Sequence, residues 1–482
     1  MRKCFITVLS VMALSSVCQG KQKAKNVLFL LVDDMQKTCI HAYGNNQVVS
    51  PNIDRIVQNG VSFAHTYTNG SLSGALSMPS RAMIMTGRGV YQVSGDGAVI
   101  PEKQVTLPEL LRQQGYTTFA TGKWHADKKS FNRSFEQADN IFFGGMHPYN
   151  QNGHLSPRLH HYDPSGTYKT PFVGEKFSSE AYADAAVQFL SSRKKDSKPF
   201  FAFVAFTSPH DPRMDHPSYG HNYNAAEMDI PVNFLPQHPF DNGELYIRDE
   251  VLSPLPRTEE AIRQELANYY GMISEVDVQI GRIVETLRKQ GELENTILVF
   301  ASDNGLAVGR HGLLGKQNLY EHSISVPMVI MASDLEKGTS KDVDCYLYDL
   351  YPTLCDMLGI APAQSVTGKS LLPVLQGANK HRDHLFLAYN SIQRALVKDH
   401  WKYIIYNVKG HITEQLFNLA DDPDEMVNLA GNVEYQFKKL AYKRILREEM
   451  KRNNDFCDLN KHYWWESPNK ISWEQAAKLY QY

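Results

Sequence analysis

Continuous hydrophobic runs alternate with amphipathic segments along most of the chain. The runs at residues 26–32, 200–207 and 296–302 are apolar throughout, which is typical of strands that are covered on both faces. Residues 178–193 and 259–290 instead place their apolar side chains at helical spacing. This alternation predicts an α/β fold with a large, mainly parallel sheet flanked by helices on both faces.

Capping and turn residues mark the ends of further elements. Ser50 followed by Pro51 is typical of a helix start, and Gly115 would end a helix over residues 107–114. Two more buried strands are predicted, at residues 117–124 and 326–331. In such sheets ligands bind beyond the carboxyl ends of the strands, so polar residues that directly follow a strand are candidates for a functional site.

The pattern changes after about residue 385, where short apolar segments are separated by turn residues. Three short strands are predicted, at residues 395–397, 402–407 and 415–418. With a helix near residues 437–451, they predict a small C-terminal antiparallel sheet with a helix. We therefore expect a main domain over residues 21–380 and a C-terminal α+β subdomain over residues 381–482.

The first twenty residues have the pattern of an export signal. Arg2 and Lys3 give a positive start, and a short apolar stretch and small residues lead to a cleavage position after Gly20. The alternative, which the preceding residue fits poorly, is lipid attachment at Cys18. We expect a signal peptide over residues 1–20 and a periplasmic or extracellular protein. No later segment is long and apolar enough to span a membrane.

The composition is that of an ordinary globular protein. Of 482 residues, 42% are hydrophobic and 21% are charged, and the formal net charge is −2. The chain therefore has no overall positive charge that would favour nucleic acid or an anionic membrane as a partner. Two of the six cysteines lie in the predicted signal, and the other four show no spacing typical of zinc but leave room for one disulfide.

Two acidic pairs follow two of the predicted buried strands. Asp33 and Asp34 come after residues 26–32, and Asp303 and Asn304 come after residues 296–302. Parallel strands end at the same edge of a sheet, so these oxygen-bearing side chains should meet there and suit Ca²⁺ or Mg²⁺. The alternative is that they are ordinary turn and cap residues.

A helix start near residue 77 provides a second candidate site. Pro79 fits the first turn of a helix, Gly87 fits its end, and Ser77 would lie at the amino end. Backbone N–H groups and the helix dipole favour an anion there, and Arg81 would lie one turn further on the same face. The alternative is a serine that only caps an amphipathic helix.

The segment SMPSRAMIMTGR at residues 77–88 resembles the signature of the type I sulfatases, members of the alkaline phosphatase superfamily, in which a Cys or Ser begins a C/S-x-P-S-R segment. The chain is similar to bacterial carbohydrate sulfatases with a serine at that position. Other family stretches occur in the expected order, and the similarity covers nearly the whole mature chain: DD at 33–34, GKWH at 122–125, SPH at 208–210, SDNG at 302–305, GRHG at 309–312 and GKQNLYE at 315–321.

The resemblance implies a modified nucleophile and a metal. Ser77 would be oxidised to formylglycine (3-oxoalanine), whose hydrate attacks sulfur and later expels sulfate by reforming the aldehyde. One calcium ion per chain would be held by Asp33, Asp34, Ser77, Asp303 and Asn304.

The resemblance also implies roles for the surrounding basic residues. Arg81 and Lys123 would stabilise the hydrate, and His125 would take the proton that triggers sulfate release. Lys316 and His210 would hold the sulfate oxygens, with His210 as the acid for the leaving alcohol.

Charged residues next to these motifs are candidates for substrate binding. Asp211 and Arg213 follow His210, and Arg310 precedes His311, which would lie near the nucleophile or the leaving group. Such groups suit a sulfated saccharide. The segment GRHGLLGKQNLYEHS is similar to sulfatases that act on galactose or N-acetylgalactosamine sulfates. A serine-type signature also implies a radical maturase as a transient partner.

Two other functions stay open from the sequence. A phosphodiesterase or phosphonate monoester hydrolase of the same superfamily would share the metal and the nucleophile. A glycan-binding homologue would keep the site without formylglycine. The loop at residues 144–170, which contains four histidines, is either functional or a surface loop.

Overall fold

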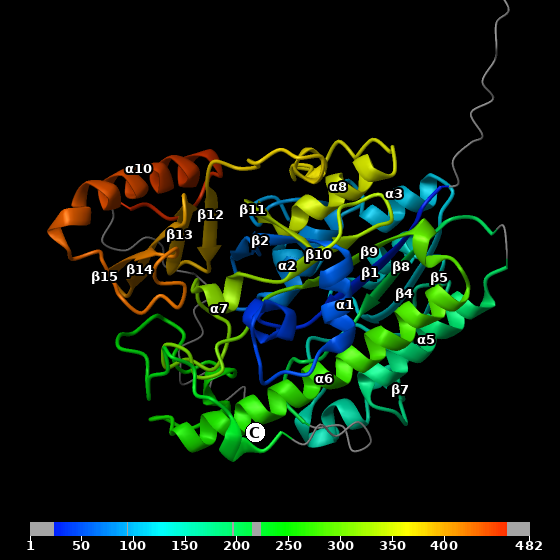
Figure 1. The fold of residues 1–482 in the computed structure, drawn as a ribbon, viewed down its shortest axis with the longest axis horizontal. Helices are drawn as coiled ribbons and strands as arrows, with labels where there is room; N and C mark the ends of the chain where they lie inside the picture. Colours follow the sequence, from blue (N-terminus) through cyan, green and yellow to red (C-terminus); the bar gives the residue numbers. More distant parts are fainter. Residues whose placement is uncertain (1–23, 94, 195–196, 215–222, 460–482) are drawn as a thin grey trace, which may run out of the picture.

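A sheet of eight strands forms the centre of the molecule (Figure 1). The computed structural model describes residues 24–93, 95–194, 197–214 and 223–459. The strand order is β11-β2-β10-β9-β1-β8-β4-β5, and every neighbouring pair is parallel except those that β10 makes with β2 and β9. The strands are β1 Asn26–Val32, β2 Val61–Tyr67, β4 Thr117–Lys123, β5 Gln137–Phe142, β8 Phe200–Ala205, β9 Thr296–Ser302, β10 Met328–Met331 and β11 Thr339–Tyr346.

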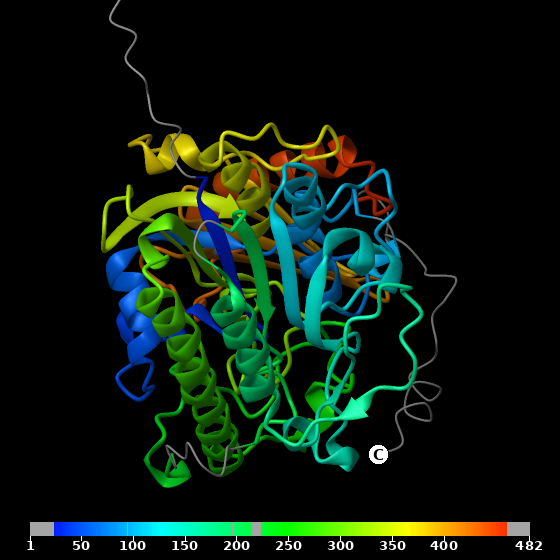
Figure 2. The ribbon, with the colours of Figure 1, turned by 90° about the vertical axis from the view of Figure 1, so that its right-hand side faces the viewer.

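Helices cover both faces of this sheet, because alternate side chains of its apolar strands point to opposite sides. Leu28 and Leu30 of β1 join one buried cluster and Phe29 joins the other. The first cluster includes α1 Pro51–Asn59, α5 Ser178–Ser192 and α6 Glu259–Lys289. The second includes α2 Ser77–Thr86, α3 Leu107–Gln113, α4 Lys128–Ser134, α8 Leu350–Met357 and α9 Leu372–Leu375. Figure 2 shows the long helix α6 beside α5 on its side of the sheet.

A second sheet of five strands lies beside the large one, with order β15-β14-β13-β12-β3. Its strands are β3 Gly70–Ser71, β12 Leu385–Tyr389, β13 Gln393–Lys398, β14 Trp401–Val408 and β15 His411–Asn418. Helix α10 (Gln436–Arg452) packs on it through Tyr442 and Leu446. Strand β3 lies in the segment between β2 and α2 and pairs with β12, so the two sheets are joined next to the start of α2.

The remaining elements are short. They are β6 Arg158–Leu159, β7 Phe172–Val173, α7 Glu321–Ile324 and the 3-10 turns Lys37–Cys39, His41–Tyr43, Gly95–Gly97, Tyr149–Gln151, Gly153–Leu155, Ala225–Glu227, Glu250–Leu252, Leu293–Asn295, Leu347–Asp349 and Val433–Tyr435.

The predicted fold class is confirmed. The structure is an α/β fold with a mostly parallel sheet between helices and a smaller, mainly antiparallel sheet that carries α10. Helix α2 starts at Ser77, and Gly87 ends it in the left-handed conformation with φ of 62°. The predicted boundary at residue 380 stays a prediction.

The structure tests only some of the predictions about the N-terminal segment and the cysteines. The signal peptide and Cys18 lie outside the described residues. Within the described ranges, no helix has the length and apolar character needed to cross a membrane. Four cysteines are described, and each is a buried free thiol: Cys39, Cys345, Cys355 and Cys457.

Candidate active site

The strand ends that carry the predicted site residues meet at one edge of the large sheet. Strands β1 and β9 are parallel and in register, with Val32 opposite Ser302, so Asp33 and Asp303 leave the sheet side by side. Strands β8 and β4 continue the same parallel array, and Lys123 is the last residue of β4. The sheet therefore brings three distant chain segments together, as the prediction from strand ends required.

Local backbone geometry fixes the direction of these ends. Asp34 and His125, each the second residue after its strand, have φ of 69° and 62°, a left-handed conformation that few residues other than glycine adopt. Gly122 has φ of 89°, and a Cβ atom there would lie 1.9 Å from the carbonyl oxygen of Ala205. Only glycine lets β4 run this close to β8, and Lys123 follows immediately.

Ser77 lies among the acidic strand ends, at the first position of α2. Its hydroxyl donates to Oδ1 of Asn304 at 3.0 Å and to Oδ1 of Asp33 at 3.2 Å. The ammonium group of Lys316 donates to the Ser77 oxygen at 3.2 Å. Only 2% of Ser77 is exposed, so a group attached there would be surrounded by protein atoms.

Three buried carboxylates lie next to three buried cations. Lys123 Nζ is 2.5 Å from Asp33 Oδ2, and Arg81 Nε is 2.8 Å from Asp303 Oδ2. Lys316 Nζ donates to both carboxylate oxygens of Asp34. Each charge thus has a partner of opposite sign, as buried charges require.

The two neighbouring aspartates differ in pKa. Burial would raise the pKa of Asp33, but the charges of Lys123 and Arg81 outweigh burial and hold it well below its usual value. Burial raises the pKa of Asp34 to about 7 although Lys316 opposes that rise. Burial and the charge of Asp33 also raise the pKa of Asp303. The raised pKa values of Asp34 and Asp303 indicate that the neighbouring cations do not fully offset the burial of these two carboxylates, so an additional cation beside them would be favourable.

The donor set fits a hard cation. Asp33, Asp34 and Asp303 offer carboxylate oxygens, Asn304 offers an amide oxygen, and the Ser77 oxygen lies between two of them. Ligand atoms of Asp33 and Asp34 lie within 4.8 Å of each other and of a ring nitrogen of His210. Oxygen-rich sets of this kind suit Ca²⁺ or Mg²⁺ better than a soft transition metal.

His125 lies close to the same charges. Its Nδ1 is buried without a hydrogen-bond partner among the described residues. Burial and the charges of Lys123 and Arg81 hold the pKa of His125 well below its usual value. The ring is therefore neutral at neutral pH and can accept a proton.

His210 approaches the acidic set from the segment after β8. Its Nε2 lies 3.7 Å from Oδ2 of Asp34, and its Nδ1 is 2.8 Å from the backbone oxygen of Asp211. Burial and Lys316 lower the pKa of His210 to about 3. Nε2 of His154, from the histidine-rich loop, contacts the backbone oxygen of His210 at 3.1 Å, so this loop helps to position it.

The predicted substrate residues next to His210 make ion pairs. Both terminal nitrogens of the Arg248 guanidinium bind the Asp211 carboxylate, the second at 2.9 Å. Arg213 instead pairs with Glu265 of α6 at 2.5 Å. No sequence motif marked Arg248, because its contact joins residues 37 positions apart in the chain.

The backbone before Lys316 is held by another residue that carried no sequence signal. The two carboxylate oxygens of Glu250 accept hydrogen bonds from the N–H groups of Leu314 and Gly315, each at 2.8 Å. Arg257 pairs with the same carboxylate at 2.5 Å. Glu250 therefore fixes the direction in which Lys316 leaves the chain.

His311 and Arg310 lie in a different environment from Ser77. The His311 ring stacks on Tyr320 with centroids 4.0 Å apart, and its Nε2 contacts the backbone oxygen of Glu425 at 3.1 Å. Burial lowers the pKa of His311 to about 4. Arg310 forms an isolated β-bridge with Phe234. The structure thus places the His311 ring against Tyr320, which belongs to the buried cluster that includes small-sheet residues.

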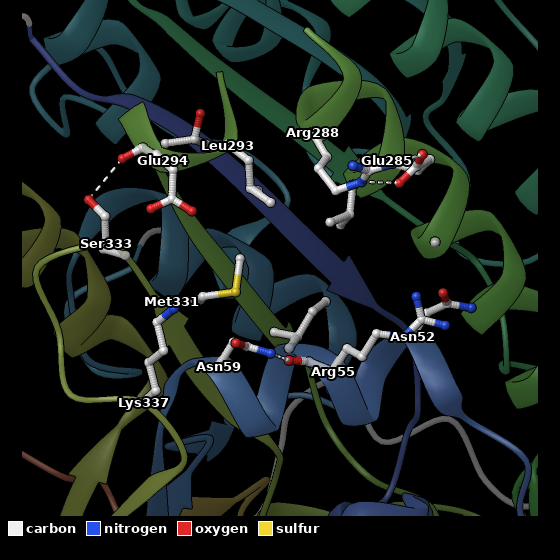
Figure 3. A pocket seen from close by; sticks show the side chains of 15 residues that line it. Asn52, Arg55, Asn59, Glu285, Arg288, Leu293, Glu294, Met331, Ser333 and Lys337 are labelled. Atoms are coloured by element: carbon white, nitrogen blue, oxygen red, sulfur yellow. Dashed lines mark hydrogen bonds and ion pairs between the residues drawn. The ribbon is translucent and has the colours of Figure 1, made fainter. Parts of the chain in front are cut away.

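A separate cavity of about 280 Å³ lies between α1, α6 and the end of β10 (Figure 3). It is lined by residues such as Asn52, Arg55, Arg288, Glu294 and Lys337. Thr296, the first residue of β9, also lines it, so it lies near the opposite end of that strand from Asp303. None of the predicted site residues lines this cavity.

Comparison with protein-family models gives two matches. The model described as Sulfatase matches residues 25–360, which is more than half of the chain. The model described as N-sulphoglucosamine sulphohydrolase, C-terminal, matches residues 309–453.

Similar proteins cover nearly the whole chain. An N-acetylglucosamine-6-O-sulfatase of Bacteroides thetaiotaomicron is 25% identical, over 93% of this chain and 90% of its own length. An arylsulfatase of Clostridium perfringens is 28% identical, over 90% of this chain and 96% of its own.

Solved structures share the fold. A protein in complex with its substrate D-glucosamine-2-N,6-O-disulfate has a TM-score of 0.74 at 24% identity, covering 90% of this chain and 99% of its own. The phosphonate monoester hydrolase of Agrobacterium radiobacter has a TM-score of 0.71 at 22% identity, covering 89% and 96%.

Proposed function

The chain belongs to the sulfatase family and is a sulfuric ester hydrolase, and from this premise we propose that it removes O-sulfate from a sulfated carbohydrate with Ser77, as formylglycine, at the centre of the reaction. The observation that carries the proposal is the position of Ser77. It lies at the amino end of α2, within hydrogen-bond distance of Asp33, Asn304 and Lys316.

Two groups that the family implies fit the residues around Ser77. A calcium ion held by Asp33, Asp34, Asp303 and Asn304, with an oxygen on residue 77, would withdraw charge from a sulfate oxygen. Formylglycine at residue 77 would supply, as its hydrate, a nucleophilic oxygen that is more acidic than a serine hydroxyl.

The basic residues around Ser77 have separate tasks. Lys123 and Arg81 pair with Asp33 and Asp303. Their positive charges offset these two carboxylates and favour an oxyanion at residue 77. Lys316 reaches the Ser77 oxygen and can bind a sulfate oxygen beside it. His125, neutral and with an unpartnered Nδ1, is the base that takes a proton from residue 77 during sulfate release.

His210 is the proposed acid for the leaving alcohol. Its ring is neutral in the free protein because its pKa is about 3. An anionic sulfate next to the ring favours the protonated form, which can then donate to the departing oxygen. The hydrogen bond from Nδ1 to the Asp211 backbone oxygen leaves Nε2 to face the acidic set.

The neighbouring ion pair favours a hydroxylated leaving group. Asp211 and Arg248 form a polar pair directly beside His210, and such a pair can exchange hydrogen bonds with sugar hydroxyls. We assign Arg213, Arg310 and His311, also predicted to bind substrate, to the surroundings of the site: the Arg213 side chain pairs with Glu265, and the His311 ring stacks on Tyr320.

The proposal extends to the sugar that carries the sulfate. The segment around His311 favours a galactose or N-acetylgalactosamine sulfate. The B. thetaiotaomicron relative is named for an N-acetylglucosamine-6-sulfate activity, which makes glucosamine sulfates the direct competitor. Sulfated hexoses and hexosamines of the galactose series and of the glucose series should therefore be compared in one assay.

A panel of monosaccharides with a single sulfate at a defined position tests this proposal. We expect sulfate release from at least one galactose-series sugar, with kcat/KM above that for glucosamine and uronate sulfates. If only glucosamine or uronate sulfates are turned over, the galactose assignment is wrong and the sulfatase activity stands. A phosphonate or phosphodiester turned over faster than every sulfate would contradict the carbohydrate sulfatase itself.

The same proposal implies how the protein is matured and exported. Serine at position 77 calls for a radical maturase that oxidises it before export. The predicted signal at residues 1–20 then directs the protein to the periplasm or the cell exterior, or to a lipid anchor if Cys18 is modified.

A further inference from the structure

A second group of potential metal ligands lies where the two sheets meet, and its residues play no part in the proposed reaction. It consists of His65 on β2, Asp342 on β11 and His400 in the turn between β13 and β14. His65 Nε2 is 3.0 Å from Asp342 Oδ1, and His400 Nε2 is 4.0 Å from Asp342 Oδ2. One ligand atom from each residue lies within 4.8 Å of the others.

An irregularity in strand pairing brings Asp342 to His65. Strands β2 and β11 are parallel, with Lys341 opposite Phe63 and Asp344 opposite His65. Two residues of β11 between these pairs therefore face one residue of β2, which is a β-bulge. Bulges redirect a side chain at the edge of a sheet, and here the redirected residue is Asp342.

The backbone at His400 is unusual for a histidine. Asp399 and His400 form the two-residue connection between β13 and β14, with φ of 48° and 59°. A hairpin turn with both central residues at positive φ favours glycine at the second position. This turn places the imidazole of His400 beside Asp342, with Nε2 4.0 Å from Oδ2.

The surroundings of the cluster can accept a cation. The residues line a hollow of about 330 Å³ that also contains Asp344, Asp383 and Asp399. Its cationic residues are engaged: Lys380 pairs with Asp383 at 2.6 Å, and Arg382 pairs with Asp349. Lys37 also faces His65, and its ammonium group is bound to the backbone oxygen of Ala64.

We propose that His65, Asp342 and His400 bind one Zn²⁺ or a similar divalent transition metal, with water as the fourth ligand. Two imidazoles and a carboxylate are ligands that zinc prefers, whereas the all-oxygen set at Ser77 suits calcium. Zinc bonds of about 2.0–2.1 Å place tetrahedral ligand atoms about 3.3 Å apart, so the ligand atoms, which lie within 4.8 Å of one another, would move closer together around the ion.

The proposed ion has a structural consequence. Asp342 belongs to β11 at the edge of the large sheet, His65 belongs to the neighbouring strand β2, and His400 lies in a turn of the small sheet. An ion bound by all three residues would link the β13–β14 turn to the β2–β11 edge. Binding to the folded chain alone would raise its stability.

The test uses the full mature protein, stripped of metal and then saturated with calcium so that the oxygen site is filled. Zn²⁺ is titrated calorimetrically, and the bound zinc is counted after gel filtration. Two variants remove ligands, His400→Gly and Asp342→Asn, and His411→Gln changes an exposed histidine in the next hairpin as the control. His400→Gly suits the positive φ, so it should fold without zinc at least as stably as the parent.

The proposal expects one zinc ion fewer per chain in both ligand variants, or affinity weakened by at least about tenfold, since even the loss of an outer-shell partner costs that much. It also expects zinc to raise the Tm of the parent and of His411→Gln but not of His400→Gly. Equal zinc stoichiometry and affinity in the parent and both ligand variants would overturn it. If His400→Gly does not fold, Asp342→Asn decides by the same two readouts.

Discussion

The ammonium group of Lys316 lies 2.6 and 2.7 Å from the two carboxylate oxygens of Asp34. The same nitrogen lies 3.2 Å from the Ser77 oxygen. Lys316 therefore connects a proposed metal ligand with the proposed nucleophile. A calcium ion bound to Asp34 would compete with Lys316 for these two oxygens. The ammonium group could then turn toward a sulfate oxygen at residue 77.

Replacing Lys316 should slow sulfate release. In Lys316→Met the sulfate loses a buried positive partner, and we expect kcat/KM to fall by about 10²–10³-fold, the usual cost of removing one buried charge-stabilising donor. Steady-state kinetics on an aryl sulfate measure this. Lys103→Met, which removes an exposed lysine, is the control. Activity within about twofold of the parent in Lys316→Met would argue against the sulfate contact.

Removal of the metal should abolish activity reversibly. Chelation leaves Asp33, Asp34 and Asp303 with less compensating charge, so we expect both kcat and the Tm to fall and calcium to restore them. Asp303→Asn removes the carboxylate that pairs with Arg81 and should weaken calcium binding. Restoration by Mg²⁺ but not by Ca²⁺ would replace calcium with magnesium in this account.

The two site histidines should differ in their dependence on the leaving group. His210→Ala should slow sugar sulfates, whose alcohols leave poorly, by about 10²-fold or more, and should affect aryl sulfates with acidic phenols much less. His125→Ala acts after the alcohol has left, so it should slow both substrates equally and show a burst of released phenol. The same slope against leaving-group pKa in both variants would contradict these separate roles.

A buried acid on α6 should make stability depend on pH. Burial raises the pKa of Glu275 from 4.5 to about 8 in the folded chain. Between these values the unfolded chain has released the proton and the folded chain has kept it, so the free energy of unfolding falls as pH rises. Glu275→Gln should remove this loss and stabilise the protein by on the order of 3 kcal/mol at pH 8.

Urea unfolding at pH 5 and pH 8 measures the Glu275 effect. The gain from Glu275→Gln should be small at pH 5 and large at pH 8. Glu285→Gln, on the exposed side of the same helix, should leave the pH dependence as it is in the parent. A gain that is equal at both pH values would show that Glu275 is charged in the folded state.

Local pattern was enough to predict that the candidate residues after β1 and β9 lie close together. Continuous apolar runs predicted β1 and β9, and the residues that follow them do meet at one sheet edge. The strands β2, β5 and β11 of the large sheet were missed, because polar residues interrupt their apolar pattern. The prediction also gave no sign that β10 runs antiparallel, since a buried apolar run carries no direction.

Long-range contacts decided what the sequence did not show. Arg248 binds Asp211, and Glu250 orients the chain before Lys316, but both contacts join residues far apart in the sequence that carry no motif. Arg213 follows His210 closely in sequence, yet it pairs with Glu265 of α6. Sequence proximity to His210 therefore identified Asp211, whose carboxylate lies 3.2 Å from the ring, but it gave no sign of Arg248.

The mass of the peptide that contains Ser77 is the most direct test of the central claim. The protein is matured in its native host, purified in active form and digested, and the peptide is then treated with an aldehyde-reactive hydroxylamine. Formylglycine predicts a peptide about 2 Da lighter than the serine form and converted by the reagent. Fully active protein whose peptide has the unmodified serine mass and does not react would contradict the account.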